Sequence, residues 1–205
     1  SKTMNLFFDR LGVMKKLLAI LVLTLCLTTP SQADDIRDFQ VEGISVGDSL
    51  LDYFSEKEIN NAEKKYYPGD KKFFNIFYNR LPQFKIYDQI QIHLKTGDKK
   101  YKIYGVTGGI NFKNNLTGCL RKKEEIASEL ANFLKDIVKE RNDDKREYKD
   151  GSGVYHVSEF YFLNQIGGAR VLCNDWSKRK SGNKSDIRVS IETGVLINWI
   201  TNEAW

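Results

Sequence analysis

Two stretches of alternating apolar and polar residues constrain the fold of this chain most strongly. Residues 90–94 read Ile-Gln-Ile-His-Leu, and residues 187–191 read Ile-Arg-Val-Ser-Ile. A period of two is typical of a strand with one buried face. The Thr-Gly-Asp turn at 96–98 predicts that residues 99–106 return antiparallel to the first strand, before a bend or bulge in the glycine-rich segment 105–109. Further strands are expected at 154–163 and 169–176.

Helical periodicity is clearest between Leu120 and Arg141. Lys and Glu residues occupy one face of this segment, and apolar residues recur on the other face. The apolar residues are Ile126, Leu130, Phe133, Leu134, Ile137 and Val138. The charged segment 142–153 is expected to be a loop. Shorter helices are predicted at 49–54, after an Asp48 N-cap, at 55–64, where Ser55 and Glu58 make a capping-box pattern, and at 195–200. The pattern predicts an α+β domain: an antiparallel sheet with one long and several short helices packed on one face, and one disulfide.

The first 33 residues have the layout of a cleavable leader. Lys15 and Lys16 precede an apolar run, and Ser31-Gln32-Ala33 ends it in a small-x-small pattern. A secretory signal peptide has this layout, and the run is shorter than the roughly 20 apolar residues needed to span a bilayer. We expect an upstream extension plus signal peptide over 1–33, with cleavage near Ala33, and a single domain over 34–205 in the periplasm or outside the cell. No stable membrane span is expected after cleavage.

The charge of the chain depends strongly on this leader. The whole chain carries 32 basic and 27 acidic residues. Four of these basic residues and one acidic residue lie in 1–33, which leaves 28 and 26, a net charge of +2. Basic and acidic residues alternate rather than cluster, so no nucleic-acid partner is expected.

Two cysteines, Cys119 and Cys173, remain beyond the leader. In an exported domain such a pair most economically forms one disulfide, which would hold the start of the long helix against the sheet. The alternative is a metal or redox pair. The chain has no Cys-x-x-Cys motif and only two histidines, so neither a metal site nor a cofactor is expected.

The segment Gly43-Ile-Ser45-Val-Gly47 matches the Gly-x-Ser-x-Gly pattern of the serine-hydrolase nucleophile elbow. Ser45 and His156 stand in the order that such a triad requires, but no parallel βαβ series surrounds them. The alternative is a turn into the following helix. An enzyme of a second kind, using the carboxylates Glu159 and Asp175, is also open.

Other polar residues have simpler interpretations. His93 falls on the polar side of its strand, which predicts a surface histidine. His156 is more typical of a structural or surface residue than of a base. Trp176 marks either a pocket rim or an indole hydrogen bond at a strand end.

Aromatic residues are dense between Tyr66 and Tyr87. Phe73, Phe74 and Phe77 suit the core-facing side of a short helix that fills the space above the sheet. The alternative is a stacking surface for sugar rings, peptides or bases, or a protein-binding patch. On that interpretation Tyr66, Tyr67 and Tyr78 are the candidate binding residues, provided that they are exposed.

The opening Phe39–Phe54, the segment around Cys119, and Cys173-Asn-Asp-Trp176 together resemble a group of uncharacterised exported bacterial proteins. The stretch Gly43–Phe54 is also similar to the start of small envelope domains of the outer-membrane assembly lipoprotein and β-lactamase-inhibitor type. It departs from them in lacking a lipobox cysteine. The second resemblance implies protein–protein binding in the bacterial envelope.

Without a convincing catalytic set, the expected function is a non-catalytic periplasmic binding domain whose partner is an envelope protein or a peptide. The competing expectations are the two hydrolases above and a small-molecule carrier. A carrier would need an apolar pocket between the long helix and the sheet.

Overall fold

The computed structural model describes residues 36–178, 182 and 184–205, all within the unit Gln32–Trp205. The predicted leader lies outside the described residues. In the described part, one antiparallel sheet has eight strands in the order β3-β4-β5-β6-β10-β9-β8-β7. The strands are β3 Glu63–Tyr66, β4 Phe73–Asn79, β5 Gln89–Lys95, β6 Ile103–Lys113, β7 Val138–Glu147, β8 Val154–Phe162, β9 Gly167–Asp175 and β10 Ser185–Thr193. The expected antiparallel α+β class is consistent with this largely β architecture.

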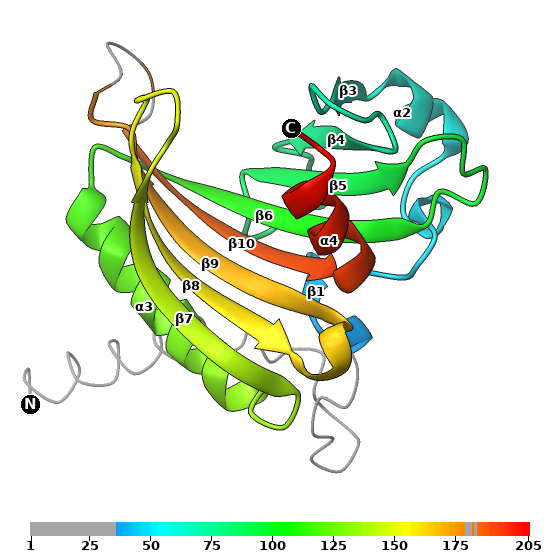
Figure 1. Cartoon of the computed structure of the whole chain (residues 1–205). Helices are drawn as coiled ribbons and strands as arrows, with labels where there is room; N and C mark the ends of the chain where they lie inside the picture. Colours follow the sequence, from blue (N-terminus) through cyan, green and yellow to red (C-terminus); the bar gives the residue numbers. More distant parts are fainter. Residues whose placement is uncertain (1–35, 179–181, 183) are drawn as a thin grey trace, which may run out of the picture. The chain divides into compact units, whose positions relative to one another are not determined.

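The chain builds this sheet from two meanders (Figure 1). Strands β3 to β6 follow one another, and helix α3 (Leu116–Phe133) then carries the chain to the far edge, where β7 begins. Strands β7 to β10 return toward the centre, so the last strand pairs with β6. Two segments that are distant in the sequence therefore meet at β6 and β10.

Helix α3 packs on one face of β8, β9, β10 and β6 (Figure 1). Its buried Ala127 and Leu130 join a core that contains Val171 and Ile187 from the sheet. The predicted disulfide between Cys119 and Cys173 is confirmed, and it ties the first turn of α3 to β9.

Helix α4 (Gly194–Asn202) packs on the opposite face of the sheet (Figure 1). Its Leu196 and Trp199 form a second cluster with Phe73 of β4. The expectation that all helices pack on one face is therefore wrong. The strands bury side chains on both faces near their centre, and period-two alternation does not tell which helix covers which face.

The long helix is shorter than predicted, because it ends at Phe133. Ile137 and Val138, which extended its apolar stripe in the sequence, lie in the following turn and at the start of β7. The segment 142–153 was expected to be a loop, but its first part belongs to β7. A charged edge strand looks like a loop in sequence, since only one of its edges is paired and charges there discourage edge-to-edge association.

The aromatic run at 73–77 is a strand rather than a helix. Phe73 and Phe74 are buried on opposite faces of β4, and Ile76 and Tyr78 are also buried. Core filling was predicted correctly for the first two phenylalanines, but the helix was wrong. A strand covered on both faces reads as a continuous apolar run, which periodicity alone does not distinguish from a helix.

The short elements near residue 50 follow their caps. Ser55 caps α2 (Glu56–Asn61) in a capping box with Glu58, as predicted. Ser49 rather than Asp48 caps the single turn η2 (Leu50–Asp52), while Asp48 accepts a hydrogen bond from the Tyr53 hydroxyl at 2.5 Å.

The remaining elements are small. Strands β1 (Gln40–Val41) and β2 (Ile44–Ser45) form a separate two-stranded sheet, and single turns of 3₁₀-helix lie at η1 (Ile36–Asp38) and η3 (Leu163–Gln165). The predicted terminal helix is confirmed as α4, capped by Thr193. None of the helices described here is long and apolar enough to cross a membrane.

Candidate functional site

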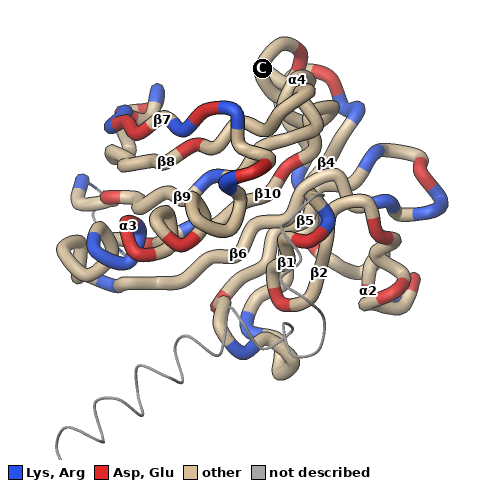
Figure 2. The backbone as a smooth tube through the Cα atoms, turned by 90° about the horizontal axis from the view of Figure 1, so that it is seen from below, with Lys and Arg blue, Asp and Glu red and all other residues tan. Residues whose placement is uncertain are grey.

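The face of the sheet that carries α4 is rich in polar side chains. Because neighbouring residues of a strand point to opposite faces, Ile187, Val189 and Ile191 of β10 face the α3 core. The alternate residues of β10 therefore face the α4 side, and all of them are polar: Asp186, Arg188, Ser190 and Glu192. Opposite charges are interspersed along β7 and α3 rather than segregated (Figure 2).

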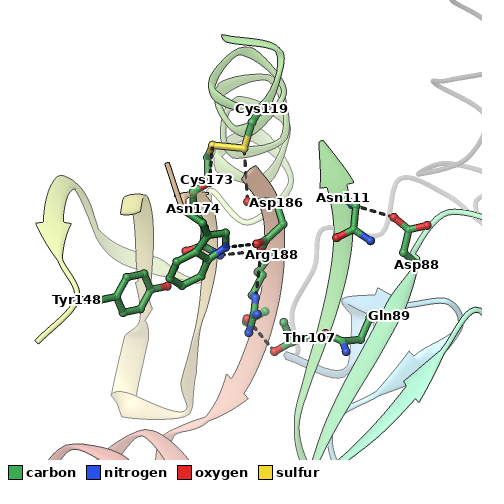
Figure 3. Close-up of polar contacts among 12 residues, drawn as sticks. Asp88, Gln89, Thr107, Asn111, Cys119, Tyr148, Cys173, Asn174, Asp186 and Arg188 are labelled. Carbon is green, nitrogen blue, oxygen red and sulfur yellow. Dashed lines mark hydrogen bonds and ion pairs between the residues drawn. A yellow bond between two sulfur atoms is a disulfide. The ribbon is translucent and has the colours of Figure 1, made fainter. Parts of the chain in front are cut away.

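Asp186 is the centre of a buried hydrogen-bond network (Figure 3). Its Oδ1 accepts a hydrogen bond from Asn174 Nδ2 at 2.7 Å, and its Oδ2 accepts one from the indole Nε1 of Trp176 at 2.5 Å. The Tyr148 hydroxyl in turn donates to Asn174 Oδ1 at 2.6 Å. Of the two interpretations of Trp176, the geometry matches an indole hydrogen bond at a strand end. A buried carboxylate with this many donors is held in one orientation.

Arg188 extends this network toward solvent. Its Nε donates to Asp186 Oδ1 at 3.2 Å, and its side chain is 39% exposed whereas that of Asp186 is 13% exposed. The carboxylate therefore acts as a buried anchor for a partly exposed guanidinium. Behind β10, Cys119 Sγ lies 3.4 Å from the backbone oxygen of Asp186, so the disulfide is adjacent to this network.

Arg188 lines a cavity of about 340 Å³ over strands β4, β5, β6 and β10, which we name the β6–β10 cavity. Most of its lining residues are polar, and they include Asn79, Arg80, Asp88, Gln89, Asn111 and Arg188. On the side away from Arg188, Asp88 Oδ2 accepts a hydrogen bond from the backbone N–H of Asn111 at 2.8 Å. The guanidinium of Arg80 approaches the other oxygen of Asp88, with Nε 3.9 Å from Oδ1.

Gly109 leaves room at the base of the cavity. A β-carbon at this position would make only ordinary contacts, the nearest at 3.8 Å from Gln89. The neighbouring Gly108 is different, because a β-carbon there would lie 2.4 Å from the ring of Tyr87. The two glycines therefore have distinct roles: Gly108 admits a packed ring, and Gly109 opens the cavity. The bend or bulge expected over 105–109 is found at the start of this segment, where the pairing of β6 with β5 shifts register between Ile103 and Gly105, and β6 then continues through Gly108 and Gly109.

A smaller cavity of about 150 Å³ lies between β8, β9, β10 and α4. Two ion pairs line or flank it: Arg170 contacts Glu192 at 2.7 Å, and Arg146 contacts Glu159 at 2.8 Å. Glu192 raises the pKa of the Arg170 guanidinium. Each of these charges has an opposite partner, and the cavity has less than half the volume of the β6–β10 cavity.

The prediction that His93 lies on the surface is wrong, because α4 covers the polar side of its strand. It is 2% exposed, and its Nε2 lies 2.9 Å from the Tyr67 hydroxyl. Burial lowers the pKa of His93 to about 4, which keeps the imidazole neutral.

The three candidate binding tyrosines differ in exposure. Tyr66 is 47% exposed on the edge strand β3, and Tyr67 is half-buried beside Trp199 and Trp205. Tyr78 is buried and stacked on Phe54, so it does not meet the condition of exposure set for a binding residue. Its burial raises its pKa to about 12.

The residues of the expected hydrolases do not assemble. Ser45 is buried and donates a hydrogen bond to the carbonyl of Arg37, whereas His156 lies on β8 opposite Cys173. Glu159 is engaged by Arg146, and Asp175 accepts a hydrogen bond from the backbone of Ser177. Among the described residues, Ser45, His156 and a carboxylate do not form a hydrogen-bonded set.

Sequence reasoning missed Asp186 and Arg188. The one signal in the sequence was that both residues alternate with the apolar residues of the strand at 187–191. Every solvent-facing residue of a half-buried strand has the same position, so this signal does not identify a site. Within the described ranges, no three of the His, Cys, Asp and Glu side chains are grouped to hold a metal ion. No family model, curated protein or solved structure matches this chain.

Proposed function

We propose that this protein is an exported, non-catalytic binding domain whose β6–β10 cavity binds a small polar ligand. One observation carries the proposal: a partly exposed guanidinium at the cavity wall is anchored from behind by a buried carboxylate network. A side chain that is already ordered loses little entropy when it binds, so pre-organised groups of this kind favour ligand binding.

The chemistry of the wall supports binding of a ligand with both donors and acceptors. Arg188 supplies only donors, the Asp88 carboxylate supplies only acceptors, and the side-chain amides of Asn79 and Gln89 supply both. The volume of about 340 Å³ falls at the lower end of the roughly 300–1,000 Å³ that is typical of small-molecule sites. The carrier hypothesis therefore shifts from an apolar pocket under α3 to a polar cavity on the opposite face.

Two features support export to the periplasm or beyond. The sequence of 1–33 has the signal-peptide layout, and the Cys119–Cys173 bond is of a kind that persists in oxidising compartments. A leader that is cleaved near Ala33 in a bacterial host, with mature protein recovered outside the cytoplasm, is the expected result.

A second candidate function is contact with an envelope protein or peptide along β3. Among the residues that the structure describes, this strand pairs only with β4, and all four of its residues are exposed, including Tyr66. An exposed strand edge accepts an extended segment by backbone pairing. Replacement of Lys65 by Pro, which removes a backbone donor from this strand, should abolish such pairing in a binding assay with a defined envelope peptide.

The cavity proposal is tested by filling the cavity from its base. In Gly109→Val, the added side chain occupies part of the cavity without the close contact that a side chain at Gly108 would make. Titration calorimetry of the whole chain with a panel of amino acids, short peptides, sugars and polyols should identify a binder whose affinity falls at least 10-fold in this variant.

The matched control is Arg121→Ala, on the outer side of α3, where the side chain is 80% exposed. This variant should bind the same compound with unchanged affinity. The proposal fails if no compound of the panel binds at millimolar concentration. It also fails if Gly109→Val, with a wild-type melting temperature, binds as tightly as the wild type.

A further inference from the structure

We infer that the ligand of the β6–β10 cavity carries a carboxylate group, which Arg188 binds, and a hydrogen-bond donor group that faces Asp88. This inference rests on the proposed function and adds the chemical class of the ligand. It therefore points to an amino acid or to the carboxyl-terminal end of a peptide.

The first step is the way in which Arg188 is held. Asp186 contacts it through Nε, at 3.2 Å. A guanidinium has a second edge, formed by its two terminal nitrogens, and that edge matches the two oxygens of a carboxylate. A side chain that is 39% exposed leaves this group accessible from the cavity.

The second step is the rigidity of the support. Asp186 is fixed by hydrogen bonds from Trp176 at 2.5 Å and from Asn174 at 2.7 Å, and Asn174 is itself oriented by Tyr148. The ring of Tyr148 stacks on Trp176, with centroids 4.6 Å apart. Such a support constrains the direction of the Arg188 fork as well as its charge. Direction is needed for bidentate recognition, whereas a flexible cation suffices for non-directional attraction.

The third step is the charge of the opposite wall. Asp88 presents a carboxylate there: its Oδ2 accepts the backbone N–H of Asn111, while Arg80 Nε lies 3.9 Å from its Oδ1, beyond hydrogen-bond distance. The lining carries two guanidiniums, Arg80 and Arg188, and two carboxylates, Asp88 and Asp186, so it has no net positive charge to hold a dianion such as phosphate. A single carboxylate at Arg188, combined with an ammonium or amide N–H toward Asp88, matches both walls. A neutral polyol would leave the edge formed by the two terminal nitrogens of Arg188 without a charged acceptor.

The inference is tested by titration calorimetry of the full chain with five probes. These are alanine, N-acetyl-alanyl-alanine, the carboxyl-terminal amide of that dipeptide, inorganic phosphate and glucose. We expect alanine, the dipeptide or both to bind, and amidation to weaken dipeptide binding at least 10-fold. The comparison of alanine with the dipeptide distinguishes a free amino acid from a peptide end.

Two variants assign the carboxylate to Arg188. Arg188→Lys keeps the charge but loses the fork, so binding of the carboxylate probe should fall at least 10-fold. Arg121→Lys, far from the cavity on α3, should change it less than 2-fold. As an independent readout, the amide resonance of Gly109 should shift during titration of the wild type, and melting curves should show that both variants are folded.

The inference is overturned if the amidated dipeptide binds as tightly as the acid, if phosphate or glucose binds more tightly than either carboxylate, or if no carboxylate binds at 10 mM. If phosphate or glucose binds more tightly, and Gly109→Val abolishes that binding, then the proposed function stands but the inference of a carboxylate ligand is wrong. The failures of the two proposals are therefore distinguishable.

Discussion

The hydrogen bond between Trp176 and Asp186 should contribute measurably to stability, because both groups are buried. We consider the single variants Trp176→Phe and Asp186→Asn and the double variant. Phenylalanine removes the indole donor. In the wild type, the Asp186 carboxylate accepts hydrogen bonds from Asn174, Trp176 and Arg188. Asparagine replaces one of the two carboxylate oxygens by an amide NH₂ group. That group is a donor, so it meets at least one of these three donors without an acceptor between them.

The expected magnitudes follow from these contacts. A hydrogen bond to a charged group contributes about 1.5–3 kcal/mol, and a buried donor left without an acceptor costs about 1–3 kcal/mol. We expect Asp186→Asn to lower the free energy of unfolding by about 3 kcal/mol. In the double variant the two effects should not add, because the loss of the indole donor also removes one conflict with asparagine. The coupling energy between the two sites should be about 2 kcal/mol.

The assay is urea unfolding of the oxidised protein, followed by far-ultraviolet circular dichroism so that the loss of an indole does not change the signal. The matched control cycle removes the pair Lys122–Glu125 on the exposed side of α3, where N and O are 3.1 Å apart. An exposed pair of this kind should give a coupling energy of about 0.5 kcal/mol or less. If the Trp176–Asp186 cycle is additive to within about 0.5 kcal/mol, the network does not anchor Asp186 and the argument for a pre-organised Arg188 fails.

Two further predictions concern the disulfide and the buried histidine. Replacing Cys119 and Cys173 together by alanine should lower the free energy of unfolding by about 4 kcal/mol, because the bond closes a sequence separation of 54 residues in the unfolded chain. The pKa of His93 falls from 6.5 to about 4 on folding, so between these pH values the unfolded chain binds a proton that the native protein does not. Stability should therefore fall as pH drops from 6.5 toward 4, by about 3 kcal/mol in total, and His93→Gln should flatten this dependence in urea unfolding measured at several pH values.

Each of these outcomes has a clear contrary result. A double-alanine variant as stable as the oxidised protein would mean that the disulfide does not restrict the unfolded chain. An unchanged pH dependence in His93→Gln would mean that carboxylates, rather than the buried imidazole, determine it. His156→Gln is the control for the second measurement, because that ring is only half-buried and should change the slope less.

Local sequence signals predicted those elements whose caps and faces are set by near neighbours. The capping box at Ser55, the strand at 187–191 and the terminal helix after Thr193 each depend on residues a few positions apart, and each is present. The cysteine pair was predicted because only two cysteines remain beyond the leader. Prediction failed for β4 and β7, since a doubly covered strand and a charged edge strand lack the alternation that identifies a half-buried strand.

The candidate site lay beyond sequence reasoning for a different reason. Asp186 and Arg188 come from β10, whereas Asp88, Gln89 and Gly109 come from β5 and β6. Their approach depends on the pairing of β10 with β6, which α3 makes possible by carrying the chain to the opposite edge of the sheet. No local pattern reports a pairing between strands about 80 residues apart.

The sequence by itself thus determined the short-range elements of this protein, the disulfide pair and the polar phase of its central strand. Tertiary structure alone decided which polar residues became buried anchors and which remained accessible. Side-chain alternation predicts that Asp186, His93 and Arg188 point away from the α3 core. The elements that pack over the sheet decide that Asp186 and His93 are buried and that the side chain of Arg188 is 39% exposed. Burial is a property of everything that packs around a residue, and for these side chains the covering residues come from distant parts of the chain.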